Sequence, residues 1–189
     1  MRDGHAHIGT MNEQTFFLEH VPTPIGTFPL VTDQAGRVRA LDFGDGEPAE
    51  AEARLARVLR LQYRGVTTKL TARPAPSPAR LALEAYFAGD VNALDRIEVE
   101  FGGTDFQRSV WEALRTIPAG KTLSYAALAA QVGRPTAVRA VGLANGTNPI
   151  AVIVPCHRVI GSDASLTGYG GGLERKRWLL AHEGVSVGG

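Results

Sequence analysis

A short apolar run bounded by two prolines constrains the fold of this chain more than any other feature. Residues 150–154 read Ile-Ala-Val-Ile-Val, lie between Pro149 and Pro155, and are followed at once by Cys156. A run this rich in β-branched residues and closed by prolines is typical of a buried extended segment. Pro155 fixes its own φ and favours an extended Val154, so the backbone that approaches Cys156 is stiff. We therefore expect a core segment that delivers the cysteine to a turn.

Cys156 is the only cysteine among the 189 residues. Most free cysteines are small buried apolar residues, but His157 and Arg158 follow directly, and either could stabilise a thiolate or take its proton. Neighbours in an extended segment point to opposite faces, so a water relay between Cys156 and His157 fits the sequence as well as direct contact does. One cysteine cannot form an intrachain disulfide, which indicates a reducing, cytoplasmic setting.

The composition is that of a soluble globular protein of one or two domains, with 44% hydrophobic and 21% charged residues. No apolar stretch is long enough to span a membrane, and the start lacks the apolar core of a signal peptide. Residues 1–103 carry 11 Lys and Arg against 14 Asp and Glu, whereas residues 104–189 carry 9 against 5. The mild basic excess in the half that holds Cys156 permits nucleic-acid binding without requiring it.

The N-terminal half is predicted to be a small α+β unit. Residues 1–14 are polar, and we expect a flexible extension in which His5 and His7, lacking a cluster of other ligands, form no metal site. Short β-branched and aromatic segments separated by turn residues then predict a small antiparallel sheet with helices. The expected elements are strands 16–21, 28–31 and 38–43, helices over 49–63 and through 81–87, and a strand or extended linker over 97–101. Nothing here is visibly catalytic, so residues 15–101 are interpreted as a scaffold.

After residue 103 the pattern changes to helices. The expected helices are one after the N-cap Thr104 that runs to Ile117, one over 125–132 capped by Ser124, and one over 136–145. The second and third are joined by a tight turn and have the form of a helix-turn-helix. Arg139 lies among small residues of the third helix. This pattern fits a cation that enters a DNA groove and, equally, tight helix packing with Arg139 in solvent.

Further features surround the cysteine. Asn148 precedes a proline and can bridge backbone groups of its turn, and segments 158–160 and 165–167 predict a hairpin-like wing. The loop 168–172, Gly-Tyr-Gly-Gly-Gly, either lets a flat ligand lie against the backbone or is a flexible linker. Glu183 follows a helix expected over 173–182, and it is either solvated or turned toward a histidine that it would orient.

These motifs together resemble one family closely. The matching segments are Pro155-Cys156-His157-Arg158-Val159, Asn148-Pro149, Ser124-Tyr125, Arg139-Ala140-Val141-Gly142 and Trp178-Leu179-Leu180-Ala181-His182-Glu183-Gly184. They resemble those of the O6-alkylguanine-DNA alkyltransferases, or methylated-DNA–protein-cysteine methyltransferases. The resemblance covers roughly residues 100 to 184. It implies an α+β protein with a ribonuclease-H-like companion domain over 15–101 and a C-terminal winged helix-turn-helix domain over 102–189.

The resemblance implies a single-turnover DNA repair reaction that needs no cofactor and no metal. By its position in the motif, Cys156 attacks the alkyl carbon on O6 of guanine, and also on O4 of thymine, and keeps the alkyl group as a thioether. His157 matches the base that acts through a water, Glu183 the carboxylate that orients it, and Asn148 the residue that braces the active-site turn.

Other positions match the way this family handles double-stranded DNA. It flips the alkylated nucleotide out of the duplex and docks in the minor groove. Arg139 matches the finger that fills the gap, and Tyr125 the phenol that assists flipping and helps to protonate the leaving guanine. The positions that match the substrate pocket are Ser124, Arg158, Val159, Tyr169 and Gly170. We expect a monomer, with cooperative binding to DNA left open, and no membrane partner.

The chain departs from the family pattern at two positions. Gly170 stands where some relatives carry Ser, which predicts a roomier pocket, and Gly146 stands where some carry a basic residue, which predicts weaker DNA binding. No zinc is expected in the companion half, which has no cysteine. A sensor or regulator would bind alkylated DNA without gaining mass, but relatives of that kind usually lack the cysteine. A cysteine hydrolase would need an acyl pocket, for which the sequence shows no feature.

Overall fold

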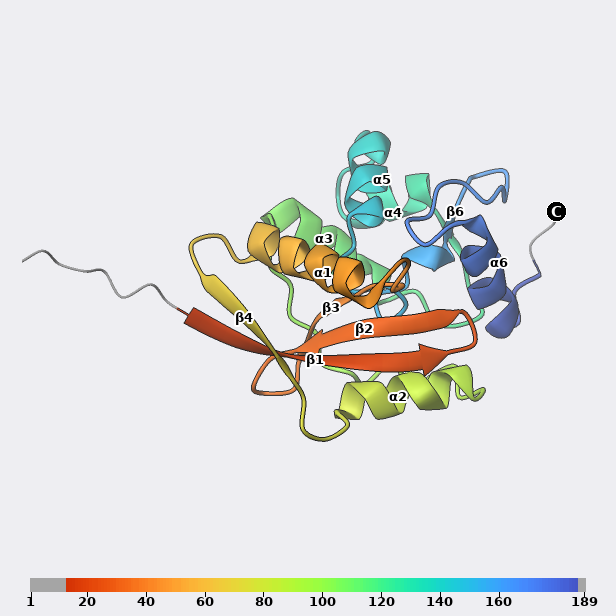
Figure 1. Ribbon diagram of the computed structural model, residues 1–189. Helices are drawn as coiled ribbons and strands as arrows, with labels where there is room; N and C mark the ends of the chain where they lie inside the picture. The colour runs from red at the N-terminus through yellow and green to blue at the C-terminus, as the bar shows by residue number, and fades with distance from the viewer. Residues whose placement is uncertain (1–12, 187–189) are drawn as a thin grey trace, which may run out of the picture.

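The computed structural model describes residues 13–186 and consists of a mixed sheet with helices around it (Figure 1). Of the expected N-terminal extension, Glu13 and Gln14 fall within this range, and both belong to the first strand. The expectation for His5 and His7 lies outside the described residues. Within residues 13–186, no helix combines the length and the apolar character needed to cross a bilayer.

Four strands form the sheet: β1 (Glu13–Thr23), β2 (Gly26–Thr32), β3 (Val38–Leu41) and β4 (Thr67–Ala72), in the order β3-β2-β1-β4. β1, β2 and β3 pair antiparallel, which confirms the predicted meander. The sequence pattern does not predict β4, and this strand pairs parallel to β1, so the expectation of a purely antiparallel sheet is wrong. β4 is a mostly exposed edge strand in which Leu70 is the single large apolar residue, so it lacks the alternation that marks a half-buried strand.

Helices α1 (Pro48–Gln62) and α2 (Pro78–Phe87) cover opposite faces of the sheet (Figure 1). Both helices are confirmed, and both begin with a proline in the first turn, where its missing N–H costs no helical hydrogen bond. Leu59 of α1 packs with Val31 of β2, whereas Leu83 of α2 shares a core with Leu30. Leu30 and Val31 are neighbours in one strand, so their side chains point to opposite faces, which explains the layering.

The C-terminal half is mostly helical (Figure 1). Its elements are α3 (Asp105–Leu114), β5 (Leu123–Ser124), α4 (Tyr125–Gln131), α5 (Val138–Gly146), the 3₁₀ turn η1 (Cys156–Arg158), β6 (Val159–Ile160) and α6 (Leu173–His182). Both predicted caps are present: Thr104 forms a reciprocal capping box with Gln107, and the Ser124 hydroxyl accepts a first-turn N–H of α4. Trp111 of α3 donates from Nε1 to the carbonyl of Ala144 in α5 at 2.8 Å, which ties these two helices together.

The segment after the cysteine differs from the predicted wing. β6 pairs parallel with β5, and residues 165–167 form no strand. Instead, the Asp163 carboxylate accepts the N–H of Ser165 at 3.1 Å and its hydroxyl at 2.6 Å, and Ala164 has a φ of +64°. The expected hairpin is therefore wrong, because a local turn bends the chain before a second strand can pair.

One hydrophobic core joins the two halves of the chain. Buried side chains of the sheet, α2, α3 and α6 make up this core, among them Phe28, Leu83, Trp111 and Leu179. A separate, smaller cluster under α1 includes Phe16. The sheet also reaches the cysteine segment through its backbone, since Leu41 N–H donates to Pro149 O at 2.9 Å and Ala151 N–H donates to Leu41 O at 3.0 Å. The segment that carries the cysteine is thus anchored on the N-terminal half.

Candidate active site

The segment before Cys156 is buried, as predicted, but it is coiled rather than extended. Val152 adopts a left-handed φ of +68°, which is uncommon for a β-branched residue. The backbone groups bond within the segment: Val154 N–H donates to Ile150 O at 3.0 Å, and Cys156 N–H donates to Val154 O at 2.8 Å. The prediction of an extended approach is therefore wrong, because these local bonds replace the bonds that a strand would make to a neighbour.

Asn148 braces this turn and the cysteine at the same time. Its Nδ2 donates to the carbonyl of Val154 at 2.8 Å and to Cys156 Sγ at 3.1 Å. Its Oδ1 accepts the N–H of Ile150 at 3.0 Å. The predicted bridging of backbone groups by Asn148 is confirmed, and the same amide fixes the position of the sulfur.

Cys156 is 7% exposed and lies in the wall of a cavity of about 150 Å³. Burial raises the pKa of the Cys156 thiol, while the Asn148 amide and the nearby charge of Lys176 act in the opposite direction. The resting sulfur is therefore a thiol, and its reaction requires a group that removes the proton.

A buried hydrogen-bonded network lies behind the cysteine. His157 Nε2 is 2.9 Å from Glu183 Oε1, and Arg158 donates from Nε to Oε2 and from Nη2 to Oε1, each at 2.9 Å. Tyr86 of α2 donates from its hydroxyl to Glu183 Oε1 at 2.8 Å. All four side chains are buried. Of the two interpretations of Glu183, the structure shows the one in which it faces a histidine.

The network sets the charges of its members. Burial acts to raise the pKa of Glu183, but hydrogen bonds from His157 and Arg158 outweigh burial and hold that pKa well below its usual range. Burial lowers the pKa of His157, against the opposing effect of Glu183, so the imidazole is neutral at pH 7. The bond to Glu183 assigns the ring proton to Nε2. His157 Nδ1 is then an acceptor, and this buried atom has no hydrogen-bond partner among the described residues.

Arg158 belongs to the network around Glu183. Its guanidinium bonds Glu183 with two nitrogens, and its Nη1 donates to the carbonyl of Ile117. The side chain is 4% exposed and does not line the cavity beside Cys156. The structure therefore places Arg158 on the Glu183 carboxylate, which it neutralises, and its expected contact with substrate stays a prediction.

Sequence reasoning missed two residues of this site, Tyr86 and Lys176. Lys176 of α6 is fully buried, and its Nζ donates to the carbonyls of Val159 at 2.7 Å and Thr167 at 3.0 Å. Burial lowers the pKa of Lys176 to about 8, with Cys156 opposing the shift. In the sequence Lys176 stands within a run of basic residues typical of a solvated face, and Tyr86 has the spacing of an ordinary core residue. No local signal could have found either of them.

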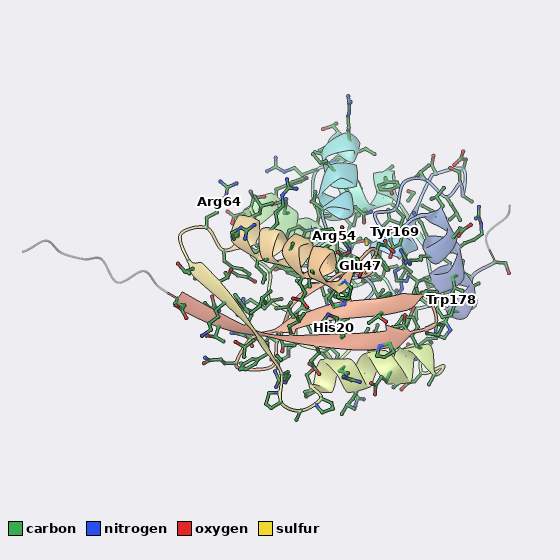
Figure 2. The ribbon with its side chains drawn as sticks, viewed as in Figure 1. His20, Glu47, Arg54, Arg64, Tyr169 and Trp178 are labelled. Atoms are coloured by element: carbon green, nitrogen blue, oxygen red, sulfur yellow. The ribbon has the colours of Figure 1, made fainter. Side chains whose placement is uncertain are left out.

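The cavity beside Cys156 is lined from both halves of the chain. Its walls come from residues 41–43 at the end of β3, from the turn that includes Asn148, and from the loop 168–171. Figure 2 shows Tyr169 of this loop in the region between α1 and α6. Because residues 41–43 form part of the wall and Tyr86 bonds Glu183, the interpretation of the N-terminal half as a scaffold alone is wrong.

The two departures from the family pattern both fall in this wall. A Cβ added to Gly146 or to Gly170 would meet no atom within 4 Å, so open space lies beside each glycine. The hydroxyl of Tyr169, between them in the wall, is buried and has no hydrogen-bond partner among the described residues. Burial raises the pKa of Tyr169 well above its usual value, and Cys156 adds to this effect. The loop thus presents a neutral phenol to the cavity.

The remaining predicted residues lie on α4 and α5. Tyr125 is half-buried beside Gly142, and burial, with a further contribution from Cys156, raises its pKa. The Ser124 hydroxyl caps α4 by accepting the N–H of Ala127. Arg139 is exposed on α5, which both interpretations of this residue require. Between residues 13 and 186, no three His, Cys, Asp or Glu side chains lie close enough to hold a metal ion.

Comparison with known proteins agrees with this geometry. Residues 105–185 match the family model described as the DNA binding domain of 6-O-methylguanine DNA methyltransferase. The methylated-DNA–protein-cysteine methyltransferase of Salmonella typhimurium is 46% identical over 166 residues, which cover 88% of this chain and 94% of that protein. The Mycobacterium tuberculosis protein of the same name is 56% identical over 128 residues, which cover 67% of this chain and 77% of that protein.

Solved structures share the fold. A crystal structure of Mycobacterium tuberculosis OGT in complex with DNA superposes with a TM-score of 0.69 and 44% identity, covering 89% of this chain and 93% of that one. The O6-methylguanine-DNA methyltransferase from Pyrococcus kodakaraensis superposes with a TM-score of 0.62 and 27% identity, covering 90% and 99%. Fold and site together define a DNA-binding α+β enzyme with a buried free cysteine in the wall of a cavity. The chain belongs to the methylated-DNA–protein-cysteine methyltransferases, a family of DNA repair enzymes.

Proposed function

We propose that Cys156 takes the alkyl group from O6 of an alkylated guanine, or from O4 of an alkylated thymine, in double-stranded DNA. In this step a bond forms between Cys156 Sγ and the alkyl carbon while the bond from that carbon to oxygen breaks, and the freed base takes up a proton. The thioether is stable, so each molecule accepts one group. The observation that carries the proposal is the position of the only cysteine, in a cavity wall, bonded by Asn148 and backed by His157 and Glu183.

In this proposal the proton of Cys156 leaves through a water to His157 Nδ1. That nitrogen is buried and open, whereas Nε2 is already bonded to Glu183. The imidazolium that forms is stabilised by a carboxylate whose pKa is held low, so it stays charged during the transfer. The charge of Lys176 lowers the pKa of the thiol and favours the thiolate at the moment of attack. Once the alkyl group has moved, this proton passes from His157 to the departing base, with Tyr125 as the relay, so that both side chains return to their neutral forms.

The damaged nucleotide has to leave the duplex before this attack. Cys156 is 7% exposed at the side of a cavity, so its sulfur cannot approach a base that remains stacked. We assign to Arg139, exposed on α5, the filling of the vacated space, and to Tyr125 the delivery of a proton to the leaving base. The pKa of Tyr125, raised by burial, keeps this phenol protonated at pH 7.

The flipped base is read by the wall of the cavity. We assign this role to the ring of Tyr169 and the backbone around Gly170, which line the cavity, and to the backbone around Val159, which lies outside that lining. The Val159 carbonyl accepts from Lys176 and has a second lone pair for a base amino group. We assign DNA binding to residues 102–189 as a domain of the winged helix-turn-helix class, in which α4 packs on α5 and a turn after β6 stands in place of a hairpin wing. We assign the companion role to residues 15–101 as a ribonuclease-H-like domain. One monomer acts on one lesion.

Intact-protein mass spectrometry tests the proposal. The protein is mixed with a duplex that contains O6-methylguanine, and the peptide with Cys156 is weighed after digestion. We expect the mass of one methyl group on that peptide, saturating at one per molecule and absent from the Cys156→Ser variant. An unchanged mass, with tight and lesion-selective binding to the duplex, would instead identify a sensor of alkylated DNA.

A further inference from the structure

We infer that Phe43, a residue of the N-terminal half, sets the size of the alkyl group that the cavity beside Cys156 accepts. This inference rests on the proposed transfer to Cys156 and adds a specificity-determining residue to it. Phe43 lies two residues after the end of β3, is 5% exposed, and lines the same cavity as the cysteine.

The Phe43 ring packs directly against the loop 168–172, with no other side chain between the ring and the backbone of Gly171. Its ring meets the ring of Tyr169 edge-on, with the two centroids 5.6 Å apart. A Cβ on Gly171 would lie 2.4 Å from Phe43 Cε2, so the loop backbone rests directly on the aromatic ring. Close-packed atoms leave no space for retreat. While the Phe43 ring is in place, the loop cannot recede on this side.

Phe43 is itself held in position. Its ring makes an edge contact with Phe28, with the centroids 5.1 Å apart, and the Arg175 guanidinium lies 5.2 Å from its centroid. Arg175 also donates to the Asp45 carboxylate at 2.6 and 2.9 Å and to the Gly171 carbonyl at 3.2 Å. Arg175 of α6 thus bonds the loop and the N-terminal half at once, so the loop and the Phe43 ring behave as one unit.

The other walls of the cavity do not set the size limit that Phe43 and the loop 168–172 set. The cavity volume of about 150 Å³ is close to that of a site that encloses a single benzene ring. The wall that carries Asn148 is fixed, because Asn148 holds its turn and the sulfur with three hydrogen bonds. Gly146 and Gly170 face open space, so the cavity is not closed at these two residues. Because the cavity must hold the flipped base as well, a bulky group next to the sulfur needs the loop to recede on the closed side, and the Phe43 ring prevents this.

The test compares alkyl transfer to the protein from two duplexes, one with O6-methylguanine and one with O6-benzylguanine, by timed quenching and intact mass. We expect Phe43→Ala to raise the ratio of the benzyl rate to the methyl rate by about tenfold or more, since even one methylene of pocket space discriminates by tenfold. Phe43→Leu should raise it less. Phe16→Ala is the matched control, because Phe16 is a buried phenylalanine of the same half that belongs to the separate cluster under α1. It should leave the ratio unchanged.

The outcomes separate the inference from the function on which it rests. If the wild-type protein accepts a methyl group but neither Phe43 variant raises the ratio, the inference is overturned and the proposed function stands. A wild-type protein that gains no mass from either duplex overturns both. If thermal unfolding shows that Phe43→Ala is not folded, the milder Phe43→Leu variant decides, and its ratio must still rise.

Discussion

Two buried carboxylates, Asp33 and Glu183, are each surrounded by arginine and tyrosine, yet their networks differ in one respect. Asp33 accepts from Arg37 Nε at 2.9 Å and from Arg39 Nη2 at 2.6 Å. Arg39 in turn donates to the Tyr63 hydroxyl at 3.0 Å. In this cluster every buried side-chain nitrogen and oxygen of Asp33, Arg39 and Tyr63 has a hydrogen-bond partner.

The Glu183 network has the same kinds of partner, from Arg158 and Tyr86, and in addition a histidine with an open nitrogen. His157 Nδ1 is buried without a partner in the described residues, next in sequence to Cys156. An ion pair in which every polar atom is hydrogen-bonded stabilises the fold, because it has no free donor or acceptor for a reaction. A buried pair with an unfilled acceptor beside a nucleophile is suited to chemistry. The free acceptor nitrogen of His157, and not burial or charge, therefore distinguishes the Glu183 network from the Asp33 network.

The largest effect that separates the two networks is expected from removing their carboxylate charges. Glu183→Gln leaves Arg158 buried without a counter-charge and should lower the free energy of unfolding by about 3 kcal/mol. It should also slow methyl transfer by about 100-fold, because the imidazolium of His157 loses its stabilising charge. Asp33→Asn should cost a similar free energy but leave the transfer rate unchanged. Urea unfolding and quenched mass spectrometry measure the two quantities. Equal slowing in both variants would show that Glu183 acts on the rate only through stability.

The second prediction concerns pH. Burial lowers the pKa of His157 from its usual 6.5, so below that pH the unfolded chain binds more protons than the folded one. Stability should therefore be constant just above pH 6.5 and fall as the pH drops below it. The transfer rate should fall only at the lower pH at which His157 of the folded protein becomes protonated, since a protonated His157 accepts no proton. The Glu183 contribution, whose pKa is lowered, is present above pH 4.5 and is lost below it. Thermal midpoints and quenched rates across this range measure the effect.

The Asp33 network supplies the control for this pH dependence. The pKa of Asp33 is lowered from 3.8, because hydrogen bonds from Arg39 and Arg37 outweigh burial, so its contribution to stability is lost only below pH 3.8. Between pH 6.5 and pH 4.5, the Asp33→Asn variant should therefore lose stability in parallel with the wild type. A transfer rate that already falls above pH 6.5 would contradict a proton acceptor whose pKa is lowered by burial.

The smallest effect is expected from the two tyrosine hydroxyls. Tyr86→Phe removes one of the hydrogen bonds to Glu183 and should cost about 1 to 2 kcal/mol of stability. The carboxylate then interacts more strongly with His157, which raises the pKa of the imidazole and moves the acid limb of the rate profile to higher pH. Tyr63→Phe removes the equivalent hydroxyl from the Asp33 network and should leave that limb in place. If the acid limb of the rate profile stays at the same pH in Tyr86→Phe, Tyr86 contributes to packing and does not tune the pKa of His157.

The sequence predicts features that depend on neighbouring residues. The helices and both caps follow from local spacing, and the bridging by Asn148 follows from its place before a proline. Strand β4 is not predicted, because an exposed edge strand carries no alternating pattern. Tyr86 and Lys176 are not predicted either, since each owes its position to contacts with residues far along the chain. The coil before Cys156 is not predicted, because it depends on Val152 adopting a left-handed backbone conformation, which β-branched residues disfavour.

The enclosure of Cys156 also has a consequence for oxidation. A cysteine that peroxide converts to a sulfenic acid is commonly rescued when a second thiol forms a disulfide with it, and this chain has no second cysteine. Peroxide reacts with the thiolate, whereas burial raises the pKa of this sulfur and keeps it protonated. The walls that shape the cavity therefore also preserve the single sulfur in its reduced form during the interval before damaged DNA arrives.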